Sequence, residues 1–506
     1  MPRRCHPAVL LAPVLAATAL AASAAATVPV PAATPSPSPA RNLQATRAYY
    51  QQVVSTPSRA SELELLMAML PKGGDLHHHY SGAIYAETYL DWAGRLGYCV
   101  HRASLRIDTA QPPAPSPAGD ECLTAQQVRD DEPTWRGLLM RWSDKDFANH
   151  PHDTPPPDQQ FFDTFGYFGA ASGWSPHDGL LQLKRRAQDE NVQYLETMMN
   201  GAARAPVPAG AGAALDALPP DAPDAAVDAT LAPLYARLLA DTALQQGVRD
   251  YRQALSEAAQ GVDDATFTLR FIAYVNRGNA PSQVFANLVA AFLAAQDNPL
   301  VVGVNIVAPE NGVVAMRDYA LHMRMFHFLK ARHPATHLSL HAGELALGMV
   351  PPEGLRDHIA QAVRVAGAER IGHGVDIAQE RGAPGLLAEM RGRGVAVEVN
   401  LASNEFILGV AGDAHPVQLY RRQGVPVVIS TDDAGVSRST LGHEYLLFAS
   451  RYRPAYDDLK RIVADSLRHA FLPPAARDAQ LRELARRFAR FEAEVAALAA
   501  SGRRAP

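Results

Sequence analysis

Residues 337–374 read HLSLHAGELALGMVPPEGLRDHIAQAVRVAGAERIGHG, and this stretch contains the repeating unit of the whole chain. An apolar run ends in His341, an amphipathic segment follows over Glu353–Ala366, and a second short run covers Arg370–His373. A strand, a helix and another strand in this order are typical of a parallel β-α-β unit. Each run ends in a histidine with a glycine close behind it, so chemically useful side chains are expected at the ends of the strands.

The same unit recurs along the chain. Further helical segments are expected at Tyr319–Arg332 and Pro384–Arg393. Eight runs are candidate strands, in chain order Gly74–His79, Val192–Met199, Thr266–Val275, Leu300–Val307, His337–His341, Arg370–His373, Val395–Leu401 and Val425–Thr431. Eight strands with intervening helices predict an α/β fold, the (β/α)8 TIM barrel, whose catalytic groups lie at the C-terminal strand ends. A doubly wound open sheet is the alternative, but no G-x-G-x-x-G turn follows the first run.

The composition is that of a globular protein. Of 506 residues, 47% are hydrophobic and 20% charged, which excludes a coiled coil, a collagen, a polytopic membrane protein and general disorder. Lys plus Arg number 47 against 52 for Asp plus Glu, a formal net charge of -5. Because there is no basic excess, neither nucleic acid nor an anionic membrane surface is expected as a partner.

The N-terminus has the pattern of a secretory signal peptide over residues 1–26. Two arginines precede the apolar run Ala8–Ala22, and the sequence ASA at 22–24 offers a cleavage site. A secreted or periplasmic protein without a membrane anchor after cleavage is expected; an uncleaved anchor is the alternative, which the short run disfavours. Cleavage leaves two cysteines, and an even count in an oxidising compartment predicts a disulfide between Cys99 and Cys122.

Behind the signal peptide, residues 27–45 form a Pro/Ser/Ala-rich linker and residues 46–500 a single (β/α)8 domain with insertions after strands 1 and 2. Three stretches are expected to be surface insertions: Thr109–Gly119, His150–Pro157 and Gly201–Asp228. The last of them, rich in Ala, Pro and Gly, is the strongest candidate for a flexible excursion. A homodimer that uses the insertions as its interface remains an open alternative.

The first strand ends in three consecutive histidines. Because strand side chains alternate, His77 and His79 lie on one face and His78 on the other. Two imidazoles at the mouth of a barrel can hold one metal ion, whereas a His-rich surface tract is the alternative.

Three later strand ends add donors of the same kind. His341 and Glu344 follow strand five, His373 ends strand six, and Asp432 with Asp433 follows strand eight. Three imidazole nitrogens and one carboxylate suit zinc with a position left open for water, which is the pattern of a catalytic site.

With these residues at its strand ends, the chain resembles the adenosine deaminase family of the metal-dependent amidohydrolases. The matching motifs are PKGGDLHHHYSGA, SLHAGEL, RIGHGVDI and STDDAG, with HPVQLYRRQGVPVVIS leading into the last and YLETMM and FIAYVNR between. With the N-terminal signal and the cysteine-bearing insertion, the chain looks closest to the family's secreted, growth-factor-related branch. The resemblance implies a zinc-dependent hydrolase that converts adenosine, and also 2′-deoxyadenosine, to inosine and ammonia.

The resemblance also implies a role for each residue. Zinc, one ion per chain, would be bound by His77, His79, His341 and Asp432. Glu344 would protonate the ring nitrogen beside the attacked carbon, His373 would orient the attacking water, and Asp433 would hold the imidazole side of the purine. The substrate-binding residues would be His79, Ser81, Gly82, Ala308 and Asp433. A second ion is not expected, because Leu300–Glu310 contains no lysine to bridge two ions.

Each of these roles has a structural alternative. Glu344 could form an ion pair at the barrel rim, Asp433 could cap a helix, and His373 could be a hydrogen-bonded core histidine. Two departures from the family pattern concern the sugar: Ser81 stands where many members have Asp, and Ala308-Pro309 replaces a Gly-containing turn.

Several other residues are assigned to packing. A group of aromatic side chains either lines the substrate entrance or, as is commoner for helices, packs in the core: Trp142, Phe161, Phe162 and Phe165. An ion pair is expected between Arg277 and Glu196, and Ser403 and Asn404 are expected to shape the rim.

Two other functions compete with adenosine deamination. The first keeps the chemistry and changes the substrate to another aminopurine, such as adenine or adenylate. The second is a secreted nucleoside-binding or receptor-binding protein built on the same barrel.

Overall fold

The computed structural model describes residues 38–113, 120–145, 147, 155–201 and 207–501. The chain divides into two units, Met1–Ser38 and Pro39–Pro506, and the second contains all the elements discussed below. The expected signal peptide at residues 1–26 and the first part of the expected linker lie outside the described residues.

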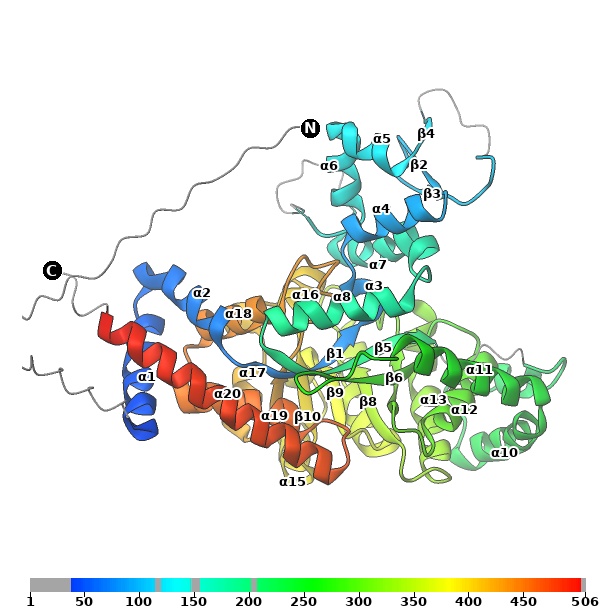
Figure 1. Cartoon of the computed structure of the whole chain (residues 1–506). Helices are drawn as coiled ribbons and strands as arrows, with labels where there is room; N and C mark the ends of the chain where they lie inside the picture. The colour runs from blue at the N-terminus through cyan, green and yellow to red at the C-terminus, as the bar shows by residue number, and fades with distance from the viewer. Residues whose placement is uncertain (1–37, 114–119, 146, 148–154, 202–206, 502–506) are drawn as a thin grey trace, which may run out of the picture. The chain divides into compact units, whose positions relative to one another are not determined.

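The second unit is an eight-stranded parallel barrel surrounded by helices (Figure 1). Its strands are hydrogen-bonded in chain order: β1 (Gly73–His79), β5 (Val192–Gly201), β6 (Thr268–Asn276), β7 (Val301–Val307), β8 (His337–Ala342), β9 (Arg370–His373), β10 (Ala396–Val399) and β11 (Val427–Ile429). Every expected strand is present, with ends within about two residues of the prediction. The (β/α)8 fold class is therefore confirmed.

The first and last strands are joined just beyond the end of β11. The Asp432 N–H donates to the His77 carbonyl at 2.8 Å, and the His79 N–H donates to the Asp432 carbonyl at 3.0 Å. The aspartate has a left-handed backbone, with φ of 59°. This junction places a carboxylate from one end of the chain between two histidines from the other.

Helices cover the outside of the barrel. Those that follow strands β6 to β11 are α12 (Pro281–Ala295), α13 (Val313–Lys330), α14 (His358–Gln361), α15 (Ala383–Arg393), α16 (Leu401–Leu408), α17 (Val417–Gln423), α18 (Leu441–Tyr452) and α19 (Tyr456–Arg468). The helix expected at Glu353–Ala366 is interrupted. It consists of η4 (Pro352–Leu355), α14 and a π-helical turn, η5 (Ala362–Ala366). The Glu380 carboxylate accepts the Ile359 N–H in the first turn of α14 at 2.5 Å.

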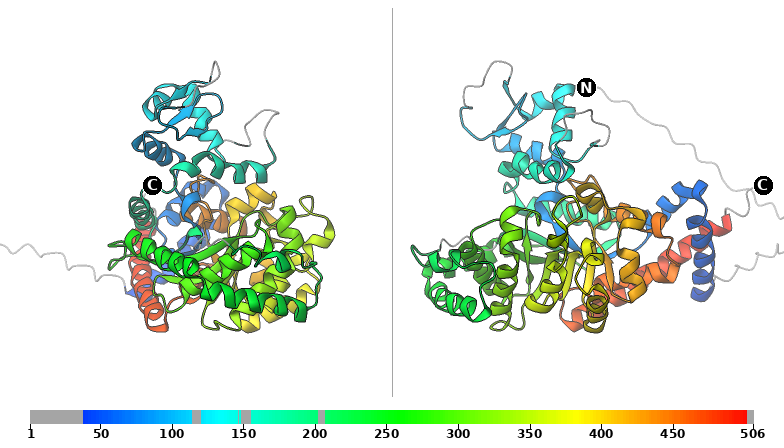
Figure 2. Two further views of the ribbon diagram at one scale, coloured as in Figure 1. Left: turned by 90° about the vertical axis from the view of Figure 1, so that its right-hand side faces the viewer. Right: turned by 180° about the vertical axis from the view of Figure 1, so that it is seen from behind.

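The first insertion lies between β1 and β5. It contains α3 (Tyr80–Ala83), α4 (Ala86–Arg95), β2 (Cys99–His101), β3 (Ile107–Asp108), β4 (Cys122–Leu123), α5 (Ala125–Asp130), α6 (Glu132–Arg141), α7 (Pro157–Phe168) and α8 (Pro176–Asp189). The expected Cys99–Cys122 disulfide is present and joins β2 to β4. Helix α7 packs on α16, and Figure 2 shows the insertion, in cyan, at one end of the barrel.

The second insertion corrects the expectation of a flexible excursion at Gly201–Asp228. Residues 202–206 lie outside the described part, but the rest folds into α9 (Ala213–Asp216) and the start of α10 (Asp224–Ala240), followed by α11 (Thr242–Ala258). The Asp216 carboxylate accepts from both the backbone N–H and the hydroxyl of Ser282, each at 2.8 Å. The segment is therefore held against the start of α12, a contact that composition does not reveal.

The N- and C-terminal helices pack together, and the expected linker is shorter than predicted because its last residues are helical. Helix α1 (Pro39–Val54) contacts α2 (Ala60–Met69) and the C-terminal α20 (Pro474–Ser501). Residues 39–45, assigned to the linker at 27–45, are helical because α1 buries one face, where the Thr46 hydroxyl donates to the Glu492 carbonyl at 3.1 Å. Among the described helices, none has both the length and the apolar composition needed to cross a bilayer.

A buried ion cluster crosses the barrel interior. Arg370 donates from Nη2 to Glu196 and from Nε to Glu398, both at 2.6 Å, and all three side chains are almost fully buried. The expected ion pair between Arg277 and Glu196 is wrong: Arg277 lies 3.6 Å from Glu310 instead. The reason is register, since Glu196 lies opposite Arg270 on β6, well before Arg277.

Arg370→Met should lower the free energy of unfolding by about 3–5 kcal/mol, because it leaves two buried carboxylates without their cation. Urea denaturation measures this loss. The matched control is Arg364→Ala, which removes the surface pair with Glu389 and should cost about 1 kcal/mol or less. Equal losses for the two variants would contradict a stabilising role for the buried cluster.

Candidate metal and catalytic site

A cavity of about 300 Å³ lies at the C-terminal ends of the barrel strands. It is lined by His79, Ser81, Phe161, Phe162, Phe165, Tyr274, Asn276, Val307, Ala308, Pro309, His341, Glu344, His373, Asp432 and Asp433. All but two of the expected site residues are among them. The two exceptions are His77, which is fully buried beside Asp432, and Gly82, which lies against Asp433.

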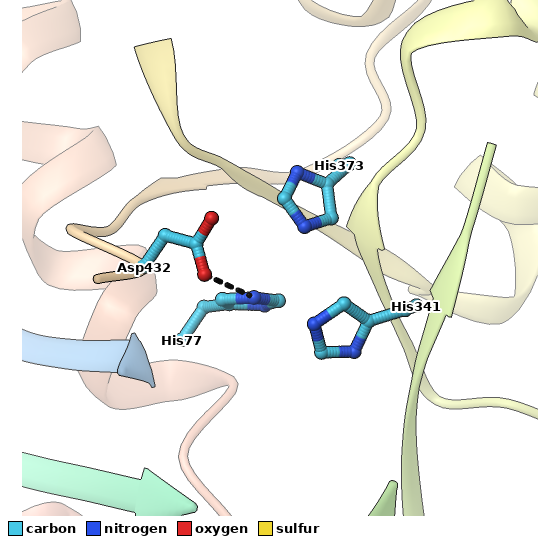
Figure 3. Close-up of side chains that lie close together, drawn as sticks. All are labelled: His77, His341, His373 and Asp432. Atoms are coloured by element: carbon cyan, nitrogen blue, oxygen red, sulfur yellow. Dashed lines mark ion pairs between the residues drawn. The ribbon is translucent and has the colours of Figure 1, made fainter. Parts of the chain in front are cut away.

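Imidazole and carboxylate donors from β1, β8 and the end of β11 converge at this cavity. The Oδ1 atom of Asp432 lies 3.4 Å from His77 Nε2 and 3.3 Å from His79 Nε2. His79 Nε2 in turn lies 3.3 Å from His341 Nε2. Figure 3 shows His77, His341, His373 and Asp432 gathered around a common centre.

These separations fit a bound zinc ion. Ligands at about 2.0–2.1 Å in a tetrahedron lie about 3.3 Å apart, which matches the measured distances. Among the described residues, His77 Nε2 has no hydrogen-bond partner although it is buried. Burial opposes a proton on His77, yet the adjacent Asp432 and Glu398 carboxylates raise its pKa to about 10, so this position favours a cation.

The rings of two ligands are oriented by side chains from neighbouring strands. His77 Nδ1 donates to Glu398 Oε2 at 2.7 Å, and His341 Nδ1 donates to Asn305 Oδ1 at 2.9 Å. Each contact directs Nε2 toward the shared centre, where a metal ion can take the place of a proton. Gly372 makes room for the first ring, since a Cβ there would lie 2.7 Å from His77 Cε1.

Sequence analysis did not identify these two orienting residues. The signal that was available is a polar residue inside an otherwise apolar strand: Glu398 in VAVEV and Asn305 in VVGVNIV. A buried carboxylate or amide in such a run needs a partner, which in a barrel is a side chain on an adjacent strand.

His373 belongs to the same cluster, but its ring presents a proton and not a lone pair. Asn404 Nδ2 donates to His373 Nδ1 at 2.9 Å, so the ring proton is on Nε2, 3.6 Å from Glu344 Oε1. Donor atoms of His77, His341, His373 and Asp432 lie close enough together to share one ion, and His79 forms a second such group with Asp432 and Asp433. The assignment of His79 as the fourth ligand and of His373 as a hydrogen-bond donor stays a prediction. Asn404, expected at the rim, is buried behind His373.

Glu344 and Asp433 both favour the protonated form. Burial, and then the charge of Asp432, raises the pKa of each carboxyl well above its usual range. Neither alternative role applies: Glu344 is buried beside His373, and no described helix starts at Asp433, whose Oδ1 has no hydrogen-bond partner among the described residues. Gly82 permits this placement, because a Cβ there would lie 1.5 Å from Asp433 Oδ1.

A further carboxylate holds the backbone of the loop after β8. Glu310 accepts the N–H groups of Gly343 and Glu344, both at 3.0 Å. His358 Nδ1 lies 2.5 Å from Glu310 Oε1, the oxygen that also accepts from Gly343, and Arg277 Nη1 lies 3.6 Å from Oε2. Sequence analysis named Glu310 only as the end of the lysine-free stretch Leu300–Glu310, yet its carboxylate holds the backbone of Glu344 in place.

The outer wall of the cavity is aromatic. Three of the four aromatic residues considered, Phe161, Phe162 and Phe165 on α7, line it, whereas Trp142 packs in the core and donates to the Leu105 carbonyl at 2.9 Å. Ala308, which also lines the cavity, has a left-handed backbone with φ of 87°. A glycine is the usual residue for that conformation.

Glu398→Gln should weaken zinc binding by about 10- to 100-fold, because His77 loses the carboxylate that orients its ring. Competition with a chromogenic chelator measures the affinity. Glu369→Gln is the matched control, since it alters a Glu–His pair (His337 Nδ1 to Glu369 Oε2, 2.7 Å) far from the donors. A zinc affinity unchanged in the first variant would contradict the orienting role of Glu398.

Comparison with known proteins agrees with this geometry. The family model described as "Adenosine deaminase" matches residues 235–487, half of the chain. The adenosine deaminase of Escherichia coli O7:K1 is 36% identical over 147 residues, which is 29% of this chain and 41% of that protein. The match thus spans less than half the length of this curated relative.

Solved structures share the fold over most of the chain. An amidohydrolase from Burkholderia ambifaria with bound Zn has a TM-score of 0.51 at 19% identity, covering 87% of this chain and 96% of its own. An N6-mAMP deaminase from Arabidopsis has a TM-score of 0.50 at 16% identity, covering 82% and 97%. By its family match, its barrel and its motifs, the chain belongs to the adenosine deaminase family.

Proposed function

We propose that the protein is a zinc-dependent aminohydrolase that converts adenosine, and also 2′-deoxyadenosine, to inosine and ammonia. The observation that carries the proposal is that one cavity is lined by two features: side-chain donors at the spacing of zinc ligands, and the buried Glu344 carboxyl, which favours the protonated form. Zinc held by His77, His79, His341 and Asp432 would supply a water activated at neutral pH, because the ion lowers the pKa of a bound water to about 7.

The protein side chains handle the protons of the reaction. Glu344 donates a proton to N1 of the purine as water attacks C6, which relieves the charge that develops on the ring. His373 donates its Nε2–H to the attacking oxygen, and Asp433 donates its carboxyl proton to N7 on the imidazole side. The ionised Glu344 then takes up the two protons of the attacking water in turn: it passes one to the amino group, which leaves as ammonia, and keeps the other, while N1 retains its proton.

The cavity favours a neutral nucleoside over the alternatives. Its described lining contains neither Lys nor Arg, so a 5′-phosphate would lack a cationic partner. Its volume leaves room beyond a purine base, with Ser81 and Asn276 as hydrogen-bonding partners for a sugar and phenylalanines around the base. Adenine would leave this space empty.

We also propose that the protein is exported. The Cys99–Cys122 disulfide supports this, because such bonds persist in oxidising compartments.

Glu344→Gln should keep its zinc and lose nearly all turnover, by about 100-fold or more, because an amide cannot deliver the proton to N1. The ultraviolet change from adenosine to inosine, before and after chelation, measures turnover, and metal analysis measures zinc. The control is Glu353→Gln on the exposed η4, which should behave as wild type. Full activity of the first variant would remove Glu344 from the mechanism.

A folded, zinc-loaded wild-type protein that is inactive on adenosine, adenine and adenylate would instead indicate a binding protein.

Adenosine should be preferred over adenylate by at least about 100-fold in kcat/KM, equivalent to about 2.7 kcal/mol for a phosphate left without a partner. Parallel assays of adenosine, 2′-deoxyadenosine, adenine and adenylate give the ranking, with 2′-deoxyadenosine as the neutral control. A preference for adenylate would assign the protein to nucleotide deamination.

A further inference from the structure

A chain of three hydrogen bonds leads from helix α17 to His373. The Val417 N–H donates to His415 Nδ1 at 3.2 Å, and His415 Nε2 lies 3.1 Å from Asn404 Oδ1. Asn404 Nδ2 lies 2.9 Å from His373 Nδ1. His415, Asn404 and His373 are each at most 2% exposed, so water does not compete for these groups.

The first donor, the Val417 N–H, determines which group donates and which accepts in each of the three hydrogen bonds. A backbone N–H can only donate, so His415 Nδ1 accepts and its remaining proton is on Nε2. That Nε2–H donates to the side-chain oxygen of Asn404, which fixes the amide orientation and directs the NH2 group at His373 Nδ1. His373 then carries its proton on Nε2, on the side of Glu344 and the cavity.

A second amide reinforces the same state. Asn400 Nδ2 lies 3.4 Å from His373 Nδ1, so two donors face this nitrogen and none of the described carboxylates does. Burial lowers the pKa of His415 to about 4, which keeps that ring neutral and limits it to one N–H. The His373 backbone, with φ of 69°, holds the ring between the amides and the metal ligands.

We propose that His415 and Asn404 are positioning residues that set the tautomer of His373, so that His373 presents an N–H to the attacking water and has no lone pair to offer the metal. The catalytic consequence rests on the proposed function. The tautomer itself does not depend on the substrate and can be measured on the metal-free protein. These three hydrogen bonds also explain why His373 lies beside the proposed metal ligands without binding the metal itself.

The experiment compares His415→Leu with His415→Gln in the full-length protein. Glutamine can place its NH2 group near the former Nε2 position and so keep a hydrogen-bond donor to Asn404 Oδ1. Leucine has no donor, so the side-chain amide of Asn404 is free to rotate by 180°. With 15N-labelled histidine, nitrogen shifts identify the tautomer in the metal-free state, and the His373 signal is assigned from its absence in His373→Gln. Asn404→Asp is a second, near-isosteric variant whose carboxylate favours a proton on His373 Nδ1.

In the wild type and His415→Gln, we expect an unprotonated Nδ1 and a protonated Nε2 on His373. In His415→Leu the two forms should mix, with kcat on adenosine lower by about 10- to 100-fold and KM little changed. Asn404→Asp should shift the proton of His373 from Nε2 to Nδ1. This variant tests the tautomer if His415→Leu does not fold.

Two results would overturn the proposal. One is a proton on His373 Nδ1 in the wild type. The other is a folded His415→Leu or Asn404→Asp variant that keeps the wild-type tautomer. Absence of adenosine turnover in the wild type would contradict the proposed function alone, because the nitrogen shifts still decide the tautomer.

Discussion

The negative charge of Glu398, buried inside the barrel, joins the stability of the fold to the chemistry of the site. One carboxylate oxygen accepts from Arg370 at 2.6 Å and from Ser339 at 2.8 Å, and the other accepts from His77 at 2.7 Å. Burial opposes this charge, but Arg370 and His77 lower the pKa of Glu398 to about 2. The same ionised group therefore neutralises the core arginine and orients His77, a candidate metal ligand.

The other active side chains are held in the same way. Each receives a contact from a different element, namely a strand, a loop or a helix: His341 from Asn305 on β7, the backbone of Glu344 from Glu310 in the loop after β7, and His373 from Asn404 on α16. The supporting residues are buried, so none can rotate away without leaving a polar group unpaired. The site geometry is thus a property of the packed barrel interior more than of the loops around the cavity.

Sequence analysis located the strands and the donors at their ends, because apolar runs and histidine spacing are local features. It failed where the decisive contact comes from elsewhere in the chain. Residues 207–228, part of the excursion expected at Gly201–Asp228, are held by a contact from Asp216 to Ser282. The Arg277 pairing depended on a register that local sequence does not contain. Asn404 was assigned to the rim because nothing near it in sequence indicates that it faces His373.

By itself, the sequence determined the barrel, the residues that converge on its C-terminal end and the chemical class to which they belong. These follow from the period of apolar residues and from residue types at strand ends, which need no knowledge of distant contacts. Only the tertiary structure decided which nitrogen of each histidine is free, and that Glu344 and Asp433 favour their protons. Those properties depend on burial and on partners far away in sequence, such as Glu398 for His77, because a pKa or a tautomer is set by the atoms that surround a group and not by its neighbours in the chain.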